Sequence, residues 1–321
     1  SKLCKDDLNS INTLILDKLD SSVPLIHEIG KYLILSGGKR LRPLLTTSCY
    51  HILNHEKSND LNHIGLAAAV EFIHAATLLH DDVIDESQLR RGHKTTNSIW
   101  GNQSSILVGD YLLSRCFEIM VEDGDHEILK LLSSTSAEIS QGEVLQLQHK
   151  GEVDMLEETY LKIISAKTAS LFAAATKVGS IISNKENKIK DALEFYGKNL
   201  GLTFQIADDT LDYNSELKFF GKEIGNDFYE GKITLPIILL YQKSNDGEKK
   251  ELKKLFEKKL RNEEEFKKVI NLIKKYNVIS LCYSKAEYFI SLASNSLSVF
   301  SETNEKIIFQ NLTSFSLERN F

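Results

Sequence analysis

Apolar residues recur at helical spacing along nearly the whole chain, whereas strand-like alternation over four to eight residues is hard to find. This pattern predicts an all-α protein. Polar stretches interrupt it at residues 54–62, 122–126, 150–154, 183–188, 214–232, 244–248 and 301–305, where one helix ends and the next begins. None of these breaks has the length or the Pro/Gly/Ser content of a linker between domains. We therefore expect a single domain that spans residues 1–321.

Three stretches differ in how the apolar positions are distributed around the helix. Residues 64–80 and 165–182 are apolar on almost every side, which is typical of central helices surrounded by others. Residues 249–275 instead have one apolar stripe opposite a charged face, which predicts a peripheral helical hairpin in contact with water. The chain has only 3 prolines, where about 5% is ordinary, so its helices can be long.

Charge and cysteine content exclude several classes of partner. Lys and Arg number 39 against 45 Asp and Glu, and a formal charge of -6 provides no basic field for nucleic acid. No apolar run reaches the roughly 18 residues of a membrane span, and the first residues resemble neither a signal peptide nor a transit peptide. The 4 cysteines are far apart in the sequence, which predicts reduced thiols and a cytoplasmic location. Because residue 1 is serine, trimming of an upstream segment stays open.

A DDxxD pattern occurs twice, at residues 81–85 and 208–212, each time directly after an apolar run. On a helix the first and last aspartates of such a pattern lie on one face, about 5–6 Å apart, and repel one another. A cation would offset this repulsion, and oxygen ligands without His or Cys favour Mg²⁺ held together with substrate phosphates. One such cluster is often only a hydrated helix end. The repetition favours a pair of metal-binding motifs.

Glycines and basic residues accompany both acidic motifs. They lie in the segment GGKRLRP at 37–43, in the segment RRG at 90–92, at 167–168 inside an apolar stretch, and along 221–232. Paired glycines allow the backbone to approach a ligand closely, and arginine binds phosphate oxygens with two nitrogens. Each segment alone is also compatible with a turn or a hydrated edge. Together with the acidic motifs they suffice for two polyphosphate groups.

The blocks GGKRLRP, DDVIDE with RRG, SAKTASLF, FQIADDTLDY and GKEIGNDFYEGKITLP resemble, in sequence and order, the motifs of trans-type isoprenyl (polyprenyl) diphosphate synthases. The resemblance covers residues 36–236 and is greatest to octaprenyl and decaprenyl diphosphate synthases. It implies an isoprenoid-synthase-type helical bundle around a central apolar cavity. It also implies a Mg²⁺-dependent prenyltransferase that condenses an allylic diphosphate with isopentenyl diphosphate. The product would be a medium- or long-chain all-trans polyprenyl diphosphate, the precursor of a quinone side chain.

The resemblance further implies roles for individual residues. The two acidic motifs would bind the metal through Asp81, Asp82, Asp85, Asp208, Asp209 and Asp212. The catalytic residues would be Asp81, Asp82, Asp85, Lys167, Asp208 and Asp209. The allylic diphosphate would contact Arg90, Lys167, Thr168, Gln205, Lys222 and Lys232. Isopentenyl diphosphate would contact Lys39, Arg42, His74 and Arg91. His74 lies two helical turns before Asp81 on the same face, although a histidine on an apolar helix is also often a core residue. More than one Mg²⁺ ion per site, a homodimer and peripheral membrane contact during product release are further expectations.

Product length would depend on the residues one turn before the first acidic motif. Ala76 and Thr77 stand there, and both are small, whereas short-chain members of the family often have aromatic residues. Their size favours a product longer than farnesyl or geranylgeranyl diphosphate. Ordinary close packing of small residues and a short-chain product both stay open.

An HD-type metal phosphohydrolase is the alternative from another class. It would use the dipeptide His80-Asp81 together with upstream histidines as metal ligands: His51, His55, His63 and His74. This hypothesis leaves the second DDxxD and the GGKRLRP segment unexplained.

Overall fold

The computed structural model describes residues 2–38, 40–54, 61–90, 92–214, 224–300, 306–307 and 309–313, with side chains from residue 5 onward. The described chain is helical apart from one short β-hairpin, which confirms the all-α prediction. It divides into two compact units, Ser1–Ser136 with Leu171–Glu194, and Ala137–Ser170 with Phe195–Phe321. We refer to these as unit 1 and unit 2, and the single domain stays a prediction.

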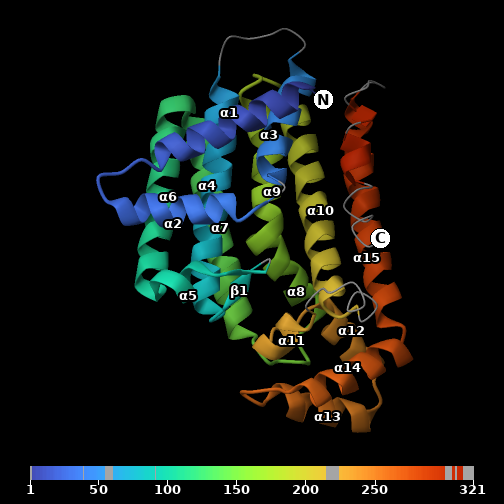
Figure 1. Cartoon of the computed structure of the whole chain (residues 1–321). Helices are drawn as coiled ribbons and strands as arrows, with labels where there is room; N and C mark the ends of the chain where they lie inside the picture. Colours follow the sequence, from blue (N-terminus) through green and yellow to red (C-terminus); the bar gives the residue numbers. More distant parts are fainter. Residues whose placement is uncertain are drawn as a thin grey trace. The chain divides into compact units, whose positions relative to one another are not determined.

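Unit 1 contains the N-terminal helices and the hairpin that follows the first acidic motif (Figure 1). Its complete elements are α1 (Lys2–Lys18), α2 (Pro24–Leu35), α3 (Leu41–Leu53), α4 (Asn62–Ile84), β1 (Leu89–Arg90), β2 (His93–Lys94), α5 (Thr96–Trp100) and α6 (Asn102–Asp123). It also includes parts of α7 (His126–Gln148), α9 (Ser170–Ile181) and α10 (Asn187–Asp212). The strands β1 and β2 are antiparallel and pair Arg90 with His93.

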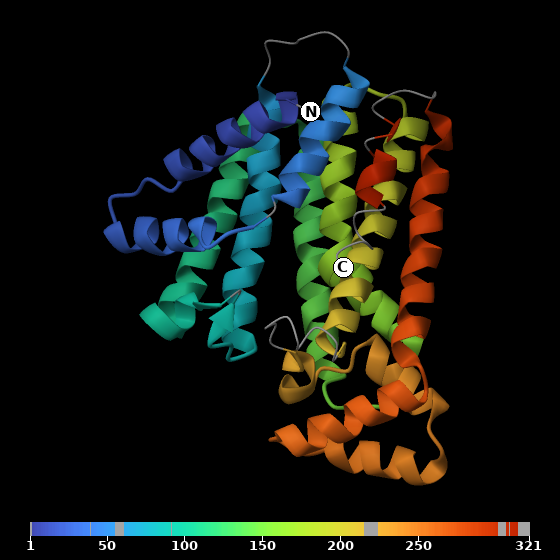
Figure 2. The same cartoon turned by 45° about the vertical axis from the view of Figure 1, so that its right-hand side comes forward.

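Helix α4 forms the centre of unit 1, as the apolar pattern of residues 64–80 predicts. It packs against α1, α3 and α6, and Figures 1 and 2 show α6 running beside it. Its side chains are buried almost continuously from His63 to Leu79, so nearly every side of the helix faces another element. The fully buried run of three alanines, 67–69, allows close approach of these neighbours.

Among the described helices, α4 is also long and apolar enough to cross a membrane by length and composition. Its most apolar 18-residue window has a mean hydropathy of 1.2, and 78% of that window is buried inside the fold. Core helices pass the same test, so this one helix is weak evidence for a membrane span.

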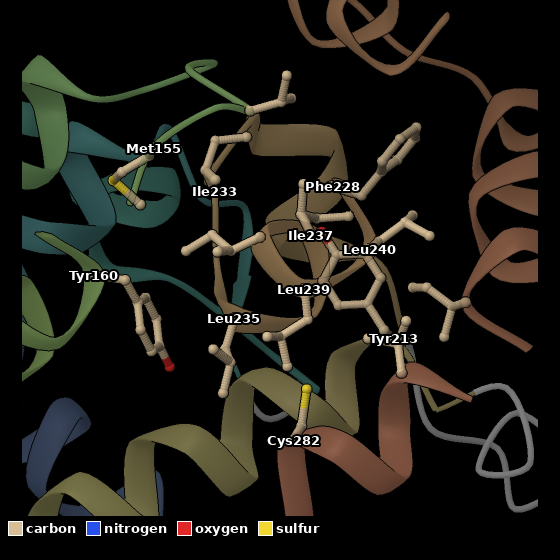
Figure 3. Packing of buried hydrophobic residues seen from close by; sticks show 14 of the residues in the cluster. Met155, Tyr160, Tyr213, Phe228, Ile233, Leu235, Ile237, Leu239, Leu240 and Cys282 are labelled. Carbon is tan, nitrogen blue, oxygen red and sulfur yellow. The ribbon is translucent and has the colours of Figure 1, made fainter. Parts of the chain in front are cut away.

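Unit 2 contains the second acidic motif and the C-terminal helices. Beyond its parts of α7 and α10 it comprises α8 (Glu157–Ile164), a π-helical turn (Ser165–Ala169), α11 (Asn226–Glu230), α12 (Leu235–Lys243), α13 (Asp246–Phe256), α14 (Glu263–Lys275), α15 (Val278–Ser296) and a 3₁₀ turn (Leu297–Val299). Its core gathers apolar residues of α8, α11, α12 and α15, and Figure 3 shows Leu235, Leu239 and Cys282 among them.

Local sequence explains how several helices begin. The three prolines lie in the first turns of α2, α3 and α12, where a backbone N–H has no helical partner to lose. Asn245 and Asn262 each form a reciprocal capping box, with Glu248 and Glu265 respectively. These two boxes start α13 and α14, which form the hairpin predicted for residues 249–275.

Candidate active site

The first acidic motif forms the last turn of α4. Asp81 and Asp82 lie inside the helix, and the N–H of Asp85 donates to the Asp81 carbonyl at 2.8 Å as the helix ends. The motif is therefore helical up to its last residue, as its spacing predicts. Negative side chains at a helix C-terminus also face the negative end of the helix dipole, which increases the need for a cation.

The buried Asp82 forms an ion pair with the half-buried Arg90 beside this turn. Nε and Nη2 of Arg90 lie 2.9 and 2.8 Å from the same Asp82 oxygen, and the Asp82 side chain is only 2% exposed. Burial raises the pKa of Asp82, Arg90 opposes this rise, and the charges of Asp81 and Asp85 add to it. Asn97 donates to the carbonyls of Asp82 and Ser87, which fixes the chain that leads into the hairpin. Asp82 thus orients the guanidinium of Arg90, which is expected to contact the allylic diphosphate.

The two arginines of the GGKRLRP segment have different surroundings. Arg40, in the left-handed conformation, lies with Nη1 2.5 Å from Glu71 and donates to the carbonyl of Ile34. Arg42 stacks on the Phe172 ring at 4.5 Å, and its Nε is buried without a hydrogen-bond partner among the described residues. Burial lowers the pKa of Arg42 to about 10 despite the nearby Glu71, so the side chain stays charged at neutral pH.

The other predicted residues that the structure describes in unit 1 lie on α4, before or within the motif. His74 is half-buried, and its carbonyl accepts the Thr77 hydroxyl at 2.8 Å. Ala76 is 2% exposed, and Thr77 is half-buried. His80 points toward α6, with Nε2 3.2 Å from the Ile106 carbonyl and 3.4 Å from Asp110.

In unit 2, Asp209 of the second motif is buried, with 5% exposure, and both its oxygens accept hydrogen bonds. The Tyr160 hydroxyl donates to Oδ2 at 2.7 Å, and Gln205 Nε2 donates to Oδ1 at 2.7 Å. Burial raises the pKa of Asp209 to about 7; the bonds from Tyr160 and Gln205 oppose the rise, and the charges of Asp208 and Asp212 contribute to it. Figure 3 shows Tyr160 within the apolar cluster of unit 2. Asp209 is therefore harder to ionise than an aspartate in water.

Asp212 joins the second motif to α11. Its Oδ1 accepts the N–H groups of Gly225 and Asn226 at 3.0 and 3.1 Å, and its Oδ2 accepts that of Asp227 at 2.9 Å. Burial raises the pKa of Asp212 to about 6, although these three bonds lower it. Burial, with the charges of Asp212 and Asp209, also raises the pKa of Asp227 well above its usual value. Asp227 is thus a further carboxyl group in the electrostatic field of the motif.

Lys167 lies in the π-helical turn, where the N–H of Ser170 donates to the Ser165 carbonyl. Its ammonium group lies 2.5 Å from Glu143 and 3.0 Å from the amide oxygen of Gln146, both on α7. A Cβ on Gly142 would lie 2.8 Å from the Lys167 backbone nitrogen, so only glycine permits this close approach. Such π-helical turns are frequent at functional sites.

A hydrogen-bonded chain links the π-helical turn to the second motif. Thr168 donates to the Gln205 Oε1 at 2.7 Å, and Gln205 donates onward to Asp209. The structure thus brings Thr168 of the SAKTASLF block together with Gln205 and Asp209 of the FQIADDTLDY block. Lys232 pairs with Glu230 at 2.8 Å, and its charge partly offsets the raised pKa of Asp227.

The structure does not test every predicted contact. Lys39, Arg91 and Lys222 lie outside the described residues. Conversely, four residues of the site were missed at the level of sequence: Glu143, Gln146, Tyr160 and Asp227. Asp227 could have been found, because it lies within the glycine- and lysine-rich segment 221–232. Tyr160 is 49 residues from Asp209, and no local pattern connects the two.

A family model described as polyprenyl synthetase matches residues 23–273. The chain belongs to the polyprenyl synthetase family. It is 41% identical over 238 residues to octaprenyl diphosphate synthase of Escherichia coli K12, which covers 74% of this chain and 73% of that protein. A polyprenyl synthase from Caulobacter crescentus, solved with calcium and isoprenyl diphosphate, has TM-score 0.94 and 39% identity, covering 100% and 97% of the two chains. A decaprenyl diphosphate synthase from Rhodobacter capsulatus has TM-score 0.93 and 38% identity, covering 99% and 97%.

Membership of the polyprenyl synthetase family confirms the fold and the enzyme class expected from the motifs. The chain is a prenyltransferase of the trans-polyprenyl diphosphate synthase type, and the family joins isopentenyl diphosphate to an allylic diphosphate with a divalent metal ion. The HD-type alternative is excluded. In agreement, His80 is engaged with α6.

Proposed function

We propose that this polyprenyl synthetase makes a medium- or long-chain all-trans polyprenyl diphosphate that serves as the precursor of a quinone side chain. The observation behind the proposal is the pair of acidic motifs. Asp82 of the first forms an ion pair with Arg90, Asp209 of the second accepts a hydrogen bond from Gln205, and both partners are suited to a diphosphate substrate. The octaprenyl and decaprenyl synthases among its relatives support the product class.

The donor set of both motifs fits Mg²⁺, because it consists of carboxylates without histidine or cysteine. We assign Asp81, Asp82 and Asp85 to one motif and Asp208, Asp209 and Asp212 to the other as ligands of more than one ion. The raised pKa values of Asp209 and Asp212 show the cost of ionising these groups without a cation. Bound Mg²⁺ would neutralise charge on the departing diphosphate.

The remaining residues bind and orient the substrates. On the allylic side we assign Arg90, Lys167, Thr168, Gln205, Lys222 and Lys232. On the isopentenyl side we assign Lys39, Arg42, His74 and Arg91. Asp82 and Glu143 hold Arg90 and Lys167 in place, and such prior orientation reduces the entropy lost when the diphosphate binds. The reaction passes through a carbocation, so an apolar interior that excludes water prevents its hydrolysis.

Ala76 and Thr77 are our candidates for residues that admit a long product. Ala76 is buried, and the Thr77 hydroxyl already donates to the His74 carbonyl, so neither side chain presents a free donor to a hydrocarbon chain. A bulky residue at either position would shorten the space before the first motif.

Exposed apolar residues support a homodimer, and buried free cysteines support a cytoplasmic location. Helix α6 exposes four large apolar side chains that a second copy of the chain would cover: Ile106, Leu107, Phe117 and Val121. This supports a homodimer. Cys49, Cys116 and Cys282 are free, buried thiols, in keeping with a cytoplasmic location, and a long hydrocarbon product implies peripheral membrane contact during its release.

The test is to incubate the enzyme with Mg²⁺, farnesyl diphosphate and labelled isopentenyl diphosphate and to size the products by chromatography. We expect products longer than geranylgeranyl diphosphate. A product no longer than that would refute the long-chain proposal and favour the short-chain alternative.

A matched pair of variants tests the acidic motif in the same assay. Asp208→Asn should abolish turnover, whereas Asp246→Asn, an exposed aspartate at the start of α13, should leave it unchanged. Equal activity of the two variants would contradict the role of Asp208.

A further inference from the structure

Three side chains suited to a transition metal converge in unit 1, away from the acidic motif. They are Asp7 on α1, His51 near the end of α3 and His63 at the start of α4. Their potential ligand atoms all lie within 4.8 Å of one another. Asp7 Oδ2 is 2.5 Å from His51 Nε2 and 3.6 Å from His63 Nε2.

His63 points to a ligand within this cluster. Its side chain is buried, with 5% residue exposure, and neither ring nitrogen is within hydrogen-bond distance of a partner in the part of the chain that the structure describes, Asp7 lying 3.6 Å from Nε2. Buried polar groups without a partner are rare and costly. The ring is also held in one orientation, because it stacks on Tyr50 with centroids 4.2 Å apart and planes inclined by only 6°. A bound metal would satisfy one of its nitrogens without moving the ring.

The donor chemistry of the cluster differs from that of the aspartate-rich motifs. Two imidazoles and one carboxylate suit Zn²⁺, with water in the fourth position, whereas Mg²⁺ prefers oxygen ligands alone. Burial would raise the pKa of Asp7, but His51 and His63 outweigh it and lower the pKa to about 2, so the carboxylate is ionised.

The distances require only a small rearrangement. Ligands about 2.0–2.1 Å from a tetrahedral zinc lie roughly 3.3 Å from one another. The separation between Asp7 and His63, 3.6 Å, already matches this value. The Asp7–His51 hydrogen bond of 2.5 Å would have to open by less than about 1 Å, as metal replaces the shared proton.

The cluster is also remote from the first acidic motif. His63 and Asp81 belong to the same continuous helix and are 18 residues apart, which corresponds to about 27 Å along its axis. We propose that Asp7, His51 and His63 form a zinc-binding site that fastens α1 to α3 and α4. The site is independent of the proposed prenyltransferase function.

The test uses the full-length protein after metal removal, titrated with Co²⁺ as a spectroscopic substitute for Zn²⁺. Millimolar Mg²⁺ is present throughout to saturate the oxygen-only motifs. We expect one equivalent of Co²⁺ per chain with the intense visible bands of a four- or five-coordinate, nitrogen-containing site, and Zn²⁺ should displace it. Zn²⁺ should also raise the melting temperature, because it binds the folded state.

Two variants and a control identify the ligands. His63→Phe retains an aromatic ring against Tyr50 but removes both nitrogens, and it should weaken Co²⁺ binding by at least about 100-fold. Asp7→Asn should weaken it as well, and it carries the test if His63→Phe does not fold. His126→Phe, at the exposed first residue of α7, is the matched control and should bind as the unchanged protein does.

The proposal is overturned if the unchanged protein takes up no Co²⁺ in the presence of Mg²⁺. It is equally overturned if the folded variants at residues 63 and 7 bind Co²⁺ as tightly as the control. Neither result depends on prenyltransferase activity, so the test does not rest on the function proposed above.

Discussion

Replacing Tyr160 with phenylalanine should make the enzyme dependent on higher Mg²⁺ concentrations in a way that varies with pH. The Tyr160 hydroxyl donates to Asp209 Oδ2 at 2.7 Å and so stabilises the ionised carboxylate. Phenylalanine keeps the buried ring and removes only this donor. The pKa of Asp209, already raised by burial to about 7, should therefore rise further.

The size of the effect follows from the hydrogen bond. A bond to a charged group is worth about 1.5–3 kcal/mol, and one pKa unit corresponds to about 1.4 kcal/mol, so the pKa should rise by about one to two units. Because protons compete with Mg²⁺ for the carboxylate, the Mg²⁺ concentration for half-maximal activity should increase about 5- to 50-fold near pH 7. Near pH 9, where Asp209 is at least about half ionised in both proteins, the difference should shrink to about 2-fold or less.

The assay measures initial rates of isopentenyl diphosphate incorporation against Mg²⁺ concentration at both pH values. Tyr213→Phe is the matched control, because Tyr213 is equally buried and its hydroxyl has no hydrogen-bond partner among the described residues. The control should show no pH-dependent change in Mg²⁺ requirement. An equal defect for Tyr160→Phe at both pH values would show that Tyr160 acts through packing alone and would refute the reasoning.

Glu71→Gln leaves Arg40 without its buried carboxylate and should lower the free energy of unfolding by about 3–5 kcal/mol. Urea unfolding measures this change, and a loss below about 1 kcal/mol would contradict a structural role for the pair. In the presence of a chelator, the melting temperature should fall as the pH is raised from about 5 to about 8. The folded protein raises the pKa of Asp209 from 3.8 to about 7 and that of Asp212 from 3.8 to about 6, so both groups stabilise the fold only while they are protonated. Asp209→Asn should reduce this fall, and an identical profile for the variant would oppose the assignment. Ala76→Phe should shorten the product in the chromatographic assay, and an unchanged length distribution would show that the growing chain does not pass Ala76.

Helical periodicity predicted much of the fold because it is a local property. The apolar stretch 64–80 corresponds to the centre of α4, Asn62–Ile84, and the charged hairpin at 249–275 corresponds to α13 and α14. The stretch 165–182, predicted to be a central helix, is helical in the structure and begins with a π-helical turn. That turn lies against Gly142, which the periodicity of residues 165–182 does not reveal.

The candidate site was predictable in composition but not in its interactions. Repeated acidic motifs are visible in the sequence, whereas the partners of Asp82, Asp209 and Lys167 come from other elements. Their pKa values depend on burial and on these partners, and neither can be computed from spacing along one helix.

By itself, the sequence determined that the chain is helical, roughly where one helix ends and the next begins, and which residues could bind metal and diphosphate. These properties depend on neighbours within a few positions along the chain. Only the tertiary structure decided that Arg90 is held by Asp82, that Tyr160 supports Asp209, and that His63 meets Asp7. Such pairs arise where separate elements of the fold pack together, and burial then determines how strongly their charges interact.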